Sequence, residues 1–490
     1  MNSRLVFALI VVISITGVLT MCSTASLNPI QQPENRTIED LVAQGDFTAA
    51  TQEIQTLLES EDLSDEMRKK YQFEIERLDR IRKDFQATRA EVEAFIKRYY
   101  PEVTEADFQR WETKKSLEWR MIDGKKMYFN RAARNLFRID SAMKALWPAD
   151  SDMDKETQDA GQTLDLNKHA LTIIEAATTS GESYVEPRRL RIKQSVSVKA
   201  DEVPDGEVIR CWIPYPRHIP GRQEEVKILN TEPMAYTLAP EEKLQRTIYF
   251  EKTARAGEST DFSVEYEMTA YGVYRQIDPD QVIAVQPNQE LAAFLGERPP
   301  HIVFSPELRA LSADIIGTET NPYRQAQLLF EWVDIHIPWA SAREYSSISC
   351  IPAYAYENGH GDCGIQTLLF MTLCRINGIP TRWQSGWELQ PPDDSMHDWG
   401  LIYFEPYGWV PMDVTYGLRE SDDTRLKWFY LSGMDSYRII FNDDISQEFY
   451  PEKTFFRSET IDSQRGEVEW SGGNLYFDQW RWNFEWEVLE

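Results

Sequence analysis

The sequence predicts an α+β protein, and three stretches with different hydrophobic periodicity support this prediction. Between residues 41 and 100 the apolar positions follow the spacing of amphipathic helices. Between residues 188 and 274 apolar and polar residues alternate with a period of two, which is typical of antiparallel strands. Residues 363–376 then show a strongly apolar helical pattern, and strand-like segments follow it.

The N-terminal region, residues 36–180, is predicted to be mainly helical with one hairpin. Asp123 and Gly124 lie between two aromatic-rich strands, and an Asp-Gly pair at such a place indicates a tight two-residue turn. Residues 132–146 again have helical spacing. The polar stretch 148–162 is expected to be a linker or loop.

The next region, residues 188–275, is predicted to be an antiparallel β-domain of sandwich type. Its alternating pattern places every second side chain on the same face of a sheet. Cys211 lies on one of these strands, where buried packing explains it better than chemistry does.

The C-terminal segment, residues 441–490, is predicted to be an aromatic-rich β-segment. Aromatic residues alternate strictly with polar ones at Trp480, Trp482, Phe484 and Trp486. Such a stripe could stack on sugar rings. Burial against a neighbouring sheet or domain is the favoured interpretation, because large aromatic side chains dominate core and interface packing.

The acidic composition excludes one class of partner. The 490 residues carry a formal net charge of −28, whereas binding to phosphate backbones needs a basic surface. We therefore expect no nucleic-acid partner. With 42% hydrophobic residues, the chain can fill the cores of about two to four globular domains.

The first 21 residues have the features of a secretion signal. Arg4 precedes an apolar run from Leu5 to Leu19, which is too short for a membrane span. Residues 19–23, with the sequence Leu-Thr-Met-Cys-Ser, are similar to a bacterial lipoprotein box, in which the cysteine is acylated. We therefore expect an exported protein of the periplasm, outer membrane or cell surface, whose membrane contact is a lipid anchor at Cys22. Ordinary signal cleavage is the alternative.

A glycine-rich approach precedes the helix that begins at Cys363, and Gly378 is a natural C-cap for this helix. A cysteine at a helix N-terminus lies among unpaired amides at the positive end of the helix dipole. Both features lower the pKa of a thiol and favour the thiolate. Cys363 is therefore the candidate nucleophile, whereas Cys374 on the same helix is expected to lie in the core.

The cysteine count argues against a disulfide scaffold. If Cys22 is lipidated, four cysteines remain, which is too few to staple a chain of this length. One pair could be oxidised in an exported protein, but a nucleophile has to stay free. The spacing alone does not identify a pair among Cys211, Cys350, Cys363 and Cys374.

His397 and Asp413 are the candidate partners of Cys363. His397 opens a strand, a turn around Pro406 follows, and the returning strand ends at Asp413. With the turn centred on Pro406, His397 lies opposite Thr415 and on the same face as Asp413, so that the two are diagonal neighbours. A shift of the turn by one residue would reverse this relationship.

These three residue types are those of a thiol-dependent catalytic site. An imidazole between a thiol and a carboxylate can take the thiol proton and later protonate a leaving amine, while the carboxylate fixes its tautomer. Taken singly, each residue has an ordinary structural explanation. Their combination predicts a Cys-His-Asp triad of Cys363, His397 and Asp413.

The residues around these positions resemble the transglutaminase-like superfamily. The resemblance covers roughly residues 321–416 and rests on four motifs: Gly361-Asp362-Cys363-Gly364, Gly378-Ile379-Pro380-Thr381-Arg382, His397-Asp398-Trp399 and Gly408-Trp409-Val410-Pro411-Met412-Asp413-Val414-Thr415. It implies a papain-like core over residues 300–440, with the cysteine at the start of a helix packed on an antiparallel sheet. The β-domain also resembles the region that often precedes this core in exported bacterial members.

The resemblance implies thiol-dependent acyl transfer at amide bonds. Cys363 would attack as the nucleophile, His397 would act as the base, and Asp413 would orient the imidazole. The thioester would pass its acyl group to water or to an amine. The expected substrates are peptides, glycopeptides or cell-wall material, and the exported setting favours hydrolysis by a peptidase or amidase over cross-linking. This chemistry needs no cofactor.

Two features depart from the family pattern. Asp398 follows the histidine where family members often carry a small residue. No side chain can be assigned to the oxyanion hole. The backbone N–H of Cys363 is one candidate donor, whereas Trp339, Gln384 and Asn358 are explained equally well as structure.

The sequence gives less support to a metal site and to two alternative functions. His360, Asp362 and Cys363 cluster locally, but they lack the paired spacing of zinc sites, so no metal is expected. The alternative function is a non-catalytic module that binds a glycan or a protein, with a vestigial triad. A third is surface assembly through the N-terminal helical region. Substrate identity and oligomeric state stay open.

Overall fold

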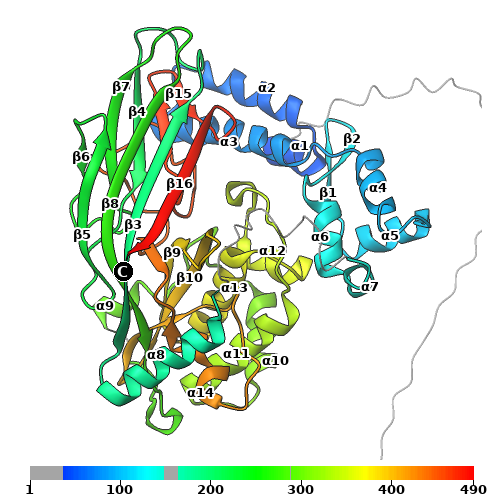
Figure 1. The fold of residues 1–490 in the computed structure, drawn as a ribbon. Coiled ribbons are helices and arrows are strands. Elements are labelled where there is room, and N and C mark those ends of the chain that lie inside the picture. The colour runs from blue at the N-terminus through cyan, green and yellow to red at the C-terminus, as the bar shows by residue number, and fades with distance from the viewer. Residues whose placement is uncertain (1–36, 148–163, 287, 490) are drawn as a thin grey trace, which may run out of the picture.

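The computed structural model describes residues 37–147, 164–286 and 288–489. In Figure 1 the N-terminal helical region lies at the upper right, a β-sandwich lies at the left, and a mixed unit of helices and a sheet lies below them. The α+β fold class is confirmed. The predicted secretion signal with Cys22, and the predicted loop 148–162, lie outside the described residues.

The N-terminal region consists of short helices and one hairpin. Its elements are α1 (Ile38–Gln44), α2 (Phe47–Leu58), α3 (Asp65–Asp84), α4 (Arg89–Lys97), α5 (Glu105–Thr113), β1 (Trp119–Ile122), β2 (Lys125–Tyr128), α6 (Ala132–Ile139) and α7 (Ser141–Lys144). The predicted hairpin is confirmed, since Asp123 and Gly124 form the turn with φ of 47° and 77°. The helix expected over 132–146 is interrupted at Asp140, because its side chain caps α7 instead.

A buried arginine fixes this region to the rest of the molecule. Leu78 and Trp111 lie in the apolar core of the region. Arg80 leaves α3, is 2% exposed, and donates from Nη1 to Ser346 Oγ (3.0 Å) and to the carbonyl of Ser458 (2.9 Å). Those acceptors belong to the mixed unit and to the C-terminal segment, so α3 is held against both.

The sandwich takes strands from the middle and from the end of the chain. One sheet has the order β12-β8-β3-β16, with β5 also paired to β8, and the other has the order β15-β14-β4-β7-β6. The strands, and the helix α8 that precedes them, are α8 (Leu166–Ser180), β3 (Tyr184–Val198), β4 (Val208–Pro214), β5 (Gln223–Glu232), β6 (Thr237–Leu238), β7 (Thr247–Thr253), β8 (Thr260–Tyr274), β12 (Gly433–Met434), β14 (Glu467–Trp470), β15 (Gly473–Leu475) and β16 (Trp480–Leu489). The core between the sheets includes Cys211, which is fully buried, as expected.

The aromatic stripe of the C-terminal segment lies on β16, which pairs with β3 along its whole length. Phe484 stacks on Trp387 of the mixed unit, with ring centroids 3.9 Å apart and planes 4° apart. Trp480 is buried, whereas Trp482 is 41% exposed. The stripe therefore serves mainly as a packed face between the sandwich and its neighbour, which was the favoured interpretation.

The mixed unit is a sheet with helices on one face and the sandwich on the other. Its sheet has the order β11-β10-β9-β13. Trp383 and Ile440 pack with α13 on one side, while Trp387 and Phe441 pack with the core of the sandwich. The elements are η1 (Pro279–Gln281), α9 (Gln289–Ala292), α10 (Pro306–Ile316), α11 (Pro322–His336), η2 (Tyr345–Ser347), α12 (Ile351–Asn358), α13 (Cys363–Ile376), β9 (Thr381–Glu388), β10 (Ser395–Phe404), β11 (Gly408–Met412), α14 (Thr424–Lys427), η3 (Phe429–Leu431) and β13 (Arg438–Asn442).

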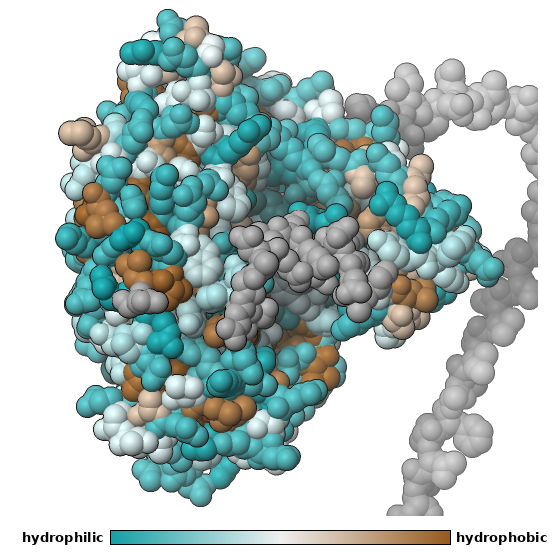
Figure 2. Space-filling model, viewed as in Figure 1, coloured by the Kyte–Doolittle hydropathy of each residue, from teal (hydrophilic) through white to brown (hydrophobic). Residues whose placement is uncertain are grey.

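The surface agrees with the acidic composition. Figure 2 shows that hydrophilic residues cover most of the visible face, with hydrophobic residues in separate patches. Among the residues that the structure describes, no helix combines the length and apolar character needed to cross a membrane.

Candidate active site

The position of Cys363 is set by the helix that it begins. Asp362 is the N-cap of α13, and its side chain accepts a hydrogen bond from the backbone N–H of Ile365 (3.1 Å). The residues before it are held by a parallel bridge between Trp339 and Gly361. Because α13 is buried from Gly364 to Arg375, core packing fixes where the cysteine lies.

His397 and Asp413 form a hydrogen-bonded pair. The hairpin of β10 and β11 has the predicted register, since Gly400 pairs with Met412. His397 Nε2 lies 2.8 Å from Asp413 Oδ2, and both side chains are buried. A carboxylate only accepts hydrogen bonds, so Nε2 carries the proton of the neutral imidazole and Nδ1 is its basic nitrogen.

The carboxylate of Asp413 is held from several sides. The backbone N–H groups of Thr415 (3.1 Å) and Tyr416 (3.3 Å) donate to Oδ1, and Arg438 Nη1 lies 3.0 Å from Oδ2. Burial raises the pKa of Asp413, but the charges of His397 and Arg438 outweigh burial and lower this pKa below its usual value. Asp413 therefore stays ionised and can orient the imidazole.

Sequence reasoning missed Arg438, which supports this pair from β13. It is fully buried, and its Nε donates to Asp435 Oδ2 (2.9 Å). Its guanidinium also lies over the rings of Trp399 (5.3 Å) and Tyr416 (4.6 Å). No motif marks an arginine at this position, so only the fold reveals its role.

The thiol of Cys363 contacts Asp398. Sγ donates to Oδ2 over 3.4 Å, and within the described residues no hydrogen bond joins Cys363 to His397. Neighbouring side chains leave a strand in opposite directions, and here it is Asp398 that points toward the sulfur. The strand that carries His397 still lies against α13, since Thr367 Oγ1 donates to the carbonyl of Asp398 (3.4 Å).

The expected lowering of the thiol pKa is wrong for this structure. Burial raises the pKa of Cys363 well above its usual value, and the carboxylates of Asp398 and Asp362 raise it further. A helix dipole contributes only about 0.3–1 kcal/mol, whereas desolvation and like charges shift buried groups by several pKa units. The resting thiol is therefore protonated.

Cys363 lines a cleft of about 840 Å³ that is formed by the N-terminal region, the mixed unit and the C-terminal segment. The N-terminal region contributes Asp84 and the mixed unit contributes Trp339, which is 40% exposed. A further part of the lining comes from residues 457–465, here called the cleft segment, of which Glu459 and Asp462 line the cleft. The sequence placed this segment outside the predicted core, so its contribution to the site was not foreseen.

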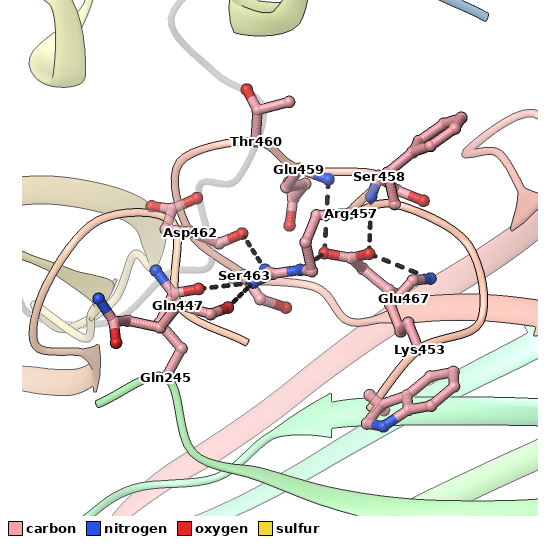
Figure 3. A network of polar contacts seen from close by, with 12 residues as sticks. Gln245, Gln447, Lys453, Arg457, Ser458, Glu459, Thr460, Asp462, Ser463 and Glu467 are labelled. Carbon is pink, nitrogen blue, oxygen red and sulfur yellow. Dashed lines mark hydrogen bonds and ion pairs between the residues drawn. The ribbon is translucent and has the colours of Figure 1, made fainter. Parts of the chain in front are cut away.

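Figure 3 shows the network of ion pairs that holds the cleft segment. The fully buried Glu467 accepts from Arg457 Nε (2.5 Å) and from the backbone N–H of Ser458 (2.7 Å), and Lys453 Nζ lies 3.2 Å from it. Arg457 also donates to the carbonyl of Asp462 (2.7 Å). Two cations thus compensate the buried carboxylate and tie the cleft segment to β14.

Gln464, in the cleft segment, reaches the strand that carries the histidine. Its Nε2 donates to Asp398 Oδ1 (2.9 Å), to the carbonyl of His397 (3.1 Å) and to the carbonyl of Gly386 (3.1 Å). Sequence reasoning missed Gln464 as well. A single amide therefore links the cleft segment to β9 and β10 beside the thiol.

The remaining candidates lie in different places. Trp339 lines the cleft. Gln384 is buried, and its Oε1 accepts a hydrogen bond from Trp399 Nε1 (3.1 Å) within the sheet. Asn358 bonds within its own helix and lies outside the cleft, and His360 is buried. Among the described residues no group of His, Cys, Asp and Glu side chains is arranged to hold a metal ion. In the same part of the chain Cys211, Cys350, Cys363 and Cys374 are free thiols.

The fold and the site together define a class of protein. A helix that begins at a cysteine, packed on an antiparallel sheet with a paired histidine and aspartate, is the arrangement of a transglutaminase-like core. Residues 309–414 match the family model of the transglutaminase-like superfamily. This part of the chain is therefore a transglutaminase-like domain, of a family of thiol-dependent enzymes, and it contains Cys363, His397 and Asp413.

Solved structures show similarities of low identity. One is a proposed cysteine protease from Cytophaga hutchinsonii, with 16% identity over 63% of this chain and 92% of that chain and a TM-score of 0.41. Another is the periplasmic domain of TgpA from Pseudomonas aeruginosa, with 14% identity, 55% and 99% of the two chains covered and a TM-score of 0.24. A proposed protease from Parabacteroides distasonis has 8% identity, with 52% and 68% covered and a TM-score of 0.20. No curated protein matches the chain.

Proposed function

We propose that the protein is an exported cysteine hydrolase that cleaves amide bonds in peptides, glycopeptides or cell-wall material. The observation that carries this proposal is the 2.8 Å pair of His397 and Asp413 beside the helix that begins at Cys363. These groups suffice for a nucleophile, a base and an orienting carboxylate. The match of residues 309–414 to a family of thiol-dependent enzymes supports the same chemistry.

The reaction follows from the protonation states of these groups. His397 Nδ1 accepts the thiol proton as the sulfur of Cys363 attacks the amide carbonyl. The C–N bond then breaks, and the imidazolium gives its proton to the leaving amine. Water attacks the thioester with His397 again as the base, and the sulfur leaves as the acid is released. The backbone N–H of Cys363 is available to the oxyanion.

This sequence of steps requires one rearrangement. In the resting structure the sulfur donates to Asp398 over 3.4 Å. It has to exchange this contact for one with His397 Nδ1 before the proton can move. A substrate in the adjoining cleft is the natural cause of this exchange, because the cleft is lined by both Cys363 and Asp398.

The cleft suits a polar substrate. Its volume of about 840 Å³ lies within the range of small-molecule and cofactor sites. Its walls carry the carboxyl groups of Asp84 and Asp462 together with the guanidinium groups of Arg343 and Arg465. A peptide or glycopeptide with several hydrogen-bonding groups fits such walls better than an apolar ligand does.

One observation favours the alternative of a non-catalytic binding module. Burial and two carboxylates raise the pKa of the Cys363 thiol, whereas an active nucleophile is expected to ionise readily. In such a module the cleft would bind a peptide or glycan without cleaving it. The test of activity below separates these two functions.

Export with a lipid anchor at Cys22 belongs to the same proposal. It is supported by the apolar run from Leu5 to Leu19 and by the lipoprotein-box-like residues 19–23. Metabolic labelling with an alkyne fatty acid in the source cell tests it. The expected result is a label that the Cys22→Ser variant loses, and a label-free wild-type protein would contradict the anchor.

The hydrolase proposal is tested by incubating the purified protein with a defined peptide mixture and with isolated peptidoglycan, followed by mass spectrometry of the products. We expect new amine and acid termini with the wild type and none with Cys363→Ala. Adding a primary amine reports on the acceptor, since hydrolysis predicts products that gain water and not the amine. Binding of the same peptides without any Cys363-dependent product would support the binding module instead.

A further inference from the structure

The contact between Cys363 and Asp398 lies outside the Cys-His-Asp scheme, yet it involves the atom that would react. The thiol donates to Asp398 Oδ2 over 3.4 Å. Asp398 is 5% exposed, so water competes little for its carboxylate. Oδ1 of the same carboxylate accepts from Gln464 Nε2 (2.9 Å), which leaves Oδ2 for the sulfur.

The surrounding residues leave room for this contact. A Cβ at position 364 would lie 2.6 Å from Asp398 Oδ2 and would also collide with the hydroxyl of Tyr345. Gly364 is therefore the residue that allows the carboxylate to approach the start of α13. Tyr345 donates to Asp362 Oδ1 (2.7 Å) and lies 3.5 Å from Asp398 Oδ2.

The charged groups around the pair disfavour a thiolate. Asp362 precedes the cysteine on α13, and Asp462 approaches from the cleft segment. Burial, Asp462 and Asp362 together raise the pKa of Asp398 well above its usual value. The Nε2 of His397 is held by Asp413, so the imidazole can take a further proton only at Nδ1.

We propose that Asp398 restrains the nucleophile: in the resting enzyme its carboxylate accepts the hydrogen bond of the Cys363 thiol and keeps the sulfur protonated. An acyl substrate in the cleft takes the place of this carboxylate beside the sulfur, and the thiol proton then passes to His397 Nδ1. Asp398 keeps its hydrogen bond from Gln464 throughout. This inference rests on the proposed function only in taking Cys363 as the nucleophile.

The test measures the rate at which iodoacetamide alkylates Cys363 as a function of pH, with peptide mapping to separate it from the other cysteines. The variants are Asp398→Asn, which keeps the size and the acceptor for Gln464, and Asp398→Ala. Asp334→Asn is the control, because Asp334 is an aspartate of intermediate burial whose pKa is also raised by burial, but it lies outside the cleft lining. Thermal unfolding of each variant checks that it folds.

Removal of a carboxylate beside the sulfur lowers the thiol pKa, and one unit corresponds to a tenfold change in the thiolate fraction. We expect Asp398→Asn to raise the alkylation rate near pH 7 by about tenfold or more, with Asp398→Ala in the same direction and Asp334→Asn unchanged. An unchanged or slower rate in both Asp398 variants would overturn the proposal, and a slower rate would make Asp398 the base.

The two proposals fail separately. Substrate turnover that depends on Cys363 and His397, together with unchanged alkylation in the Asp398 variants, would refute the restraint alone. Faster alkylation of Asp398→Asn in a protein that cleaves no substrate would support the restraint and refute the hydrolase.

Discussion

Arg438 and Asp413 form an ion pair of 3.0 Å in which both side chains are completely buried. The same carboxylate oxygen accepts the hydrogen bond of His397 Nε2 (2.8 Å). The buried carboxylate of Asp413 thus pairs with Arg438 and also accepts the hydrogen bond of His397, the candidate catalytic base. Asp413 is therefore expected to affect both the free energy of unfolding and the reaction. Substitutions of Asp413 and of Arg438 test these two roles separately.

Replacing Asp413 by asparagine tests its catalytic role. Asparagine keeps the shape but can present its amide N–H to His397 Nε2, which favours the wrong imidazole tautomer. We expect kcat on any cleaved substrate to fall by about 10²–10⁴-fold with little change in KM. Steady-state kinetics measure this effect, and a variant with unchanged kcat would remove Asp413 from the triad.

Replacing Arg438 by glutamine tests the structural side of the pair. The change leaves the carboxylates of Asp413 and Asp435 buried without their cation, which typically costs about 3–5 kcal/mol. We expect a loss of this size in the free energy of unfolding, measured with urea. Arg425→Gln is the control, since Arg425 forms a partly exposed pair with Asp423, and pairs at the surface contribute at most about 1 kcal/mol. Equal losses in both variants would contradict the account.

The raised pKa of Asp84 predicts how the free energy of unfolding depends on pH. Burial raises its folded-state pKa from 3.8 to about 7. Between these values the folded protein binds more protons at this site than the unfolded chain, so this group lowers stability as the pH rises. We expect the stability of Asp84→Asn, relative to wild type, to increase between about pH 4 and pH 7 by about 1.4 kcal/mol for each unit of pKa difference. A constant difference over this range of unfolding measurements would show that the carboxyl has an ordinary pKa.

Gly364 has a steric role that alanine would expose. The added Cβ would lie 2.6 Å from Asp398 Oδ2, so Asp398 or Tyr345 has to move. Overpacking of this kind costs about 1–3 kcal/mol, although alanine favours a helix over glycine by about 1 kcal/mol. Calorimetry of Gly364→Ala against Gly296→Ala, where nothing lies within 4 Å of the new Cβ, measures the difference. A Gly364→Ala variant as stable as its control would mean that the start of α13 is not tightly packed.

Much of the local structure could be predicted, because short-range signals determine it. The Asp-Gly turn at Asp123, the glycine-rich approach to α13 and the turn at Pro406 are local features, and the register of β10 with β11 followed from that turn. The three residues of the predicted triad also stand in recognisable motifs.

The supporting residues could not be predicted, because they come from segments distant in sequence. Arg438 and Gln464 reach the site only through sheet pairing and through the ion pairs that hold the cleft segment. The protonation of Cys363 was misjudged for a related reason. The helix N-terminus is visible in the sequence, but the burial and the carboxylate of Asp398 that outweigh it arise only in the folded chain.

The central claim is that Cys363 is a nucleophile activated by His397. It is tested most directly by exposing the protein to p-nitrophenyl acetate and locating the acetyl group by intact mass and peptide mapping. We expect an acetyl thioester on Cys363 in the wild type, none at that position in Cys363→Ala, and formation at least about 100-fold slower in His397→Ala. Acetylation that avoids Cys363, or that proceeds equally fast without the imidazole, would contradict the claim.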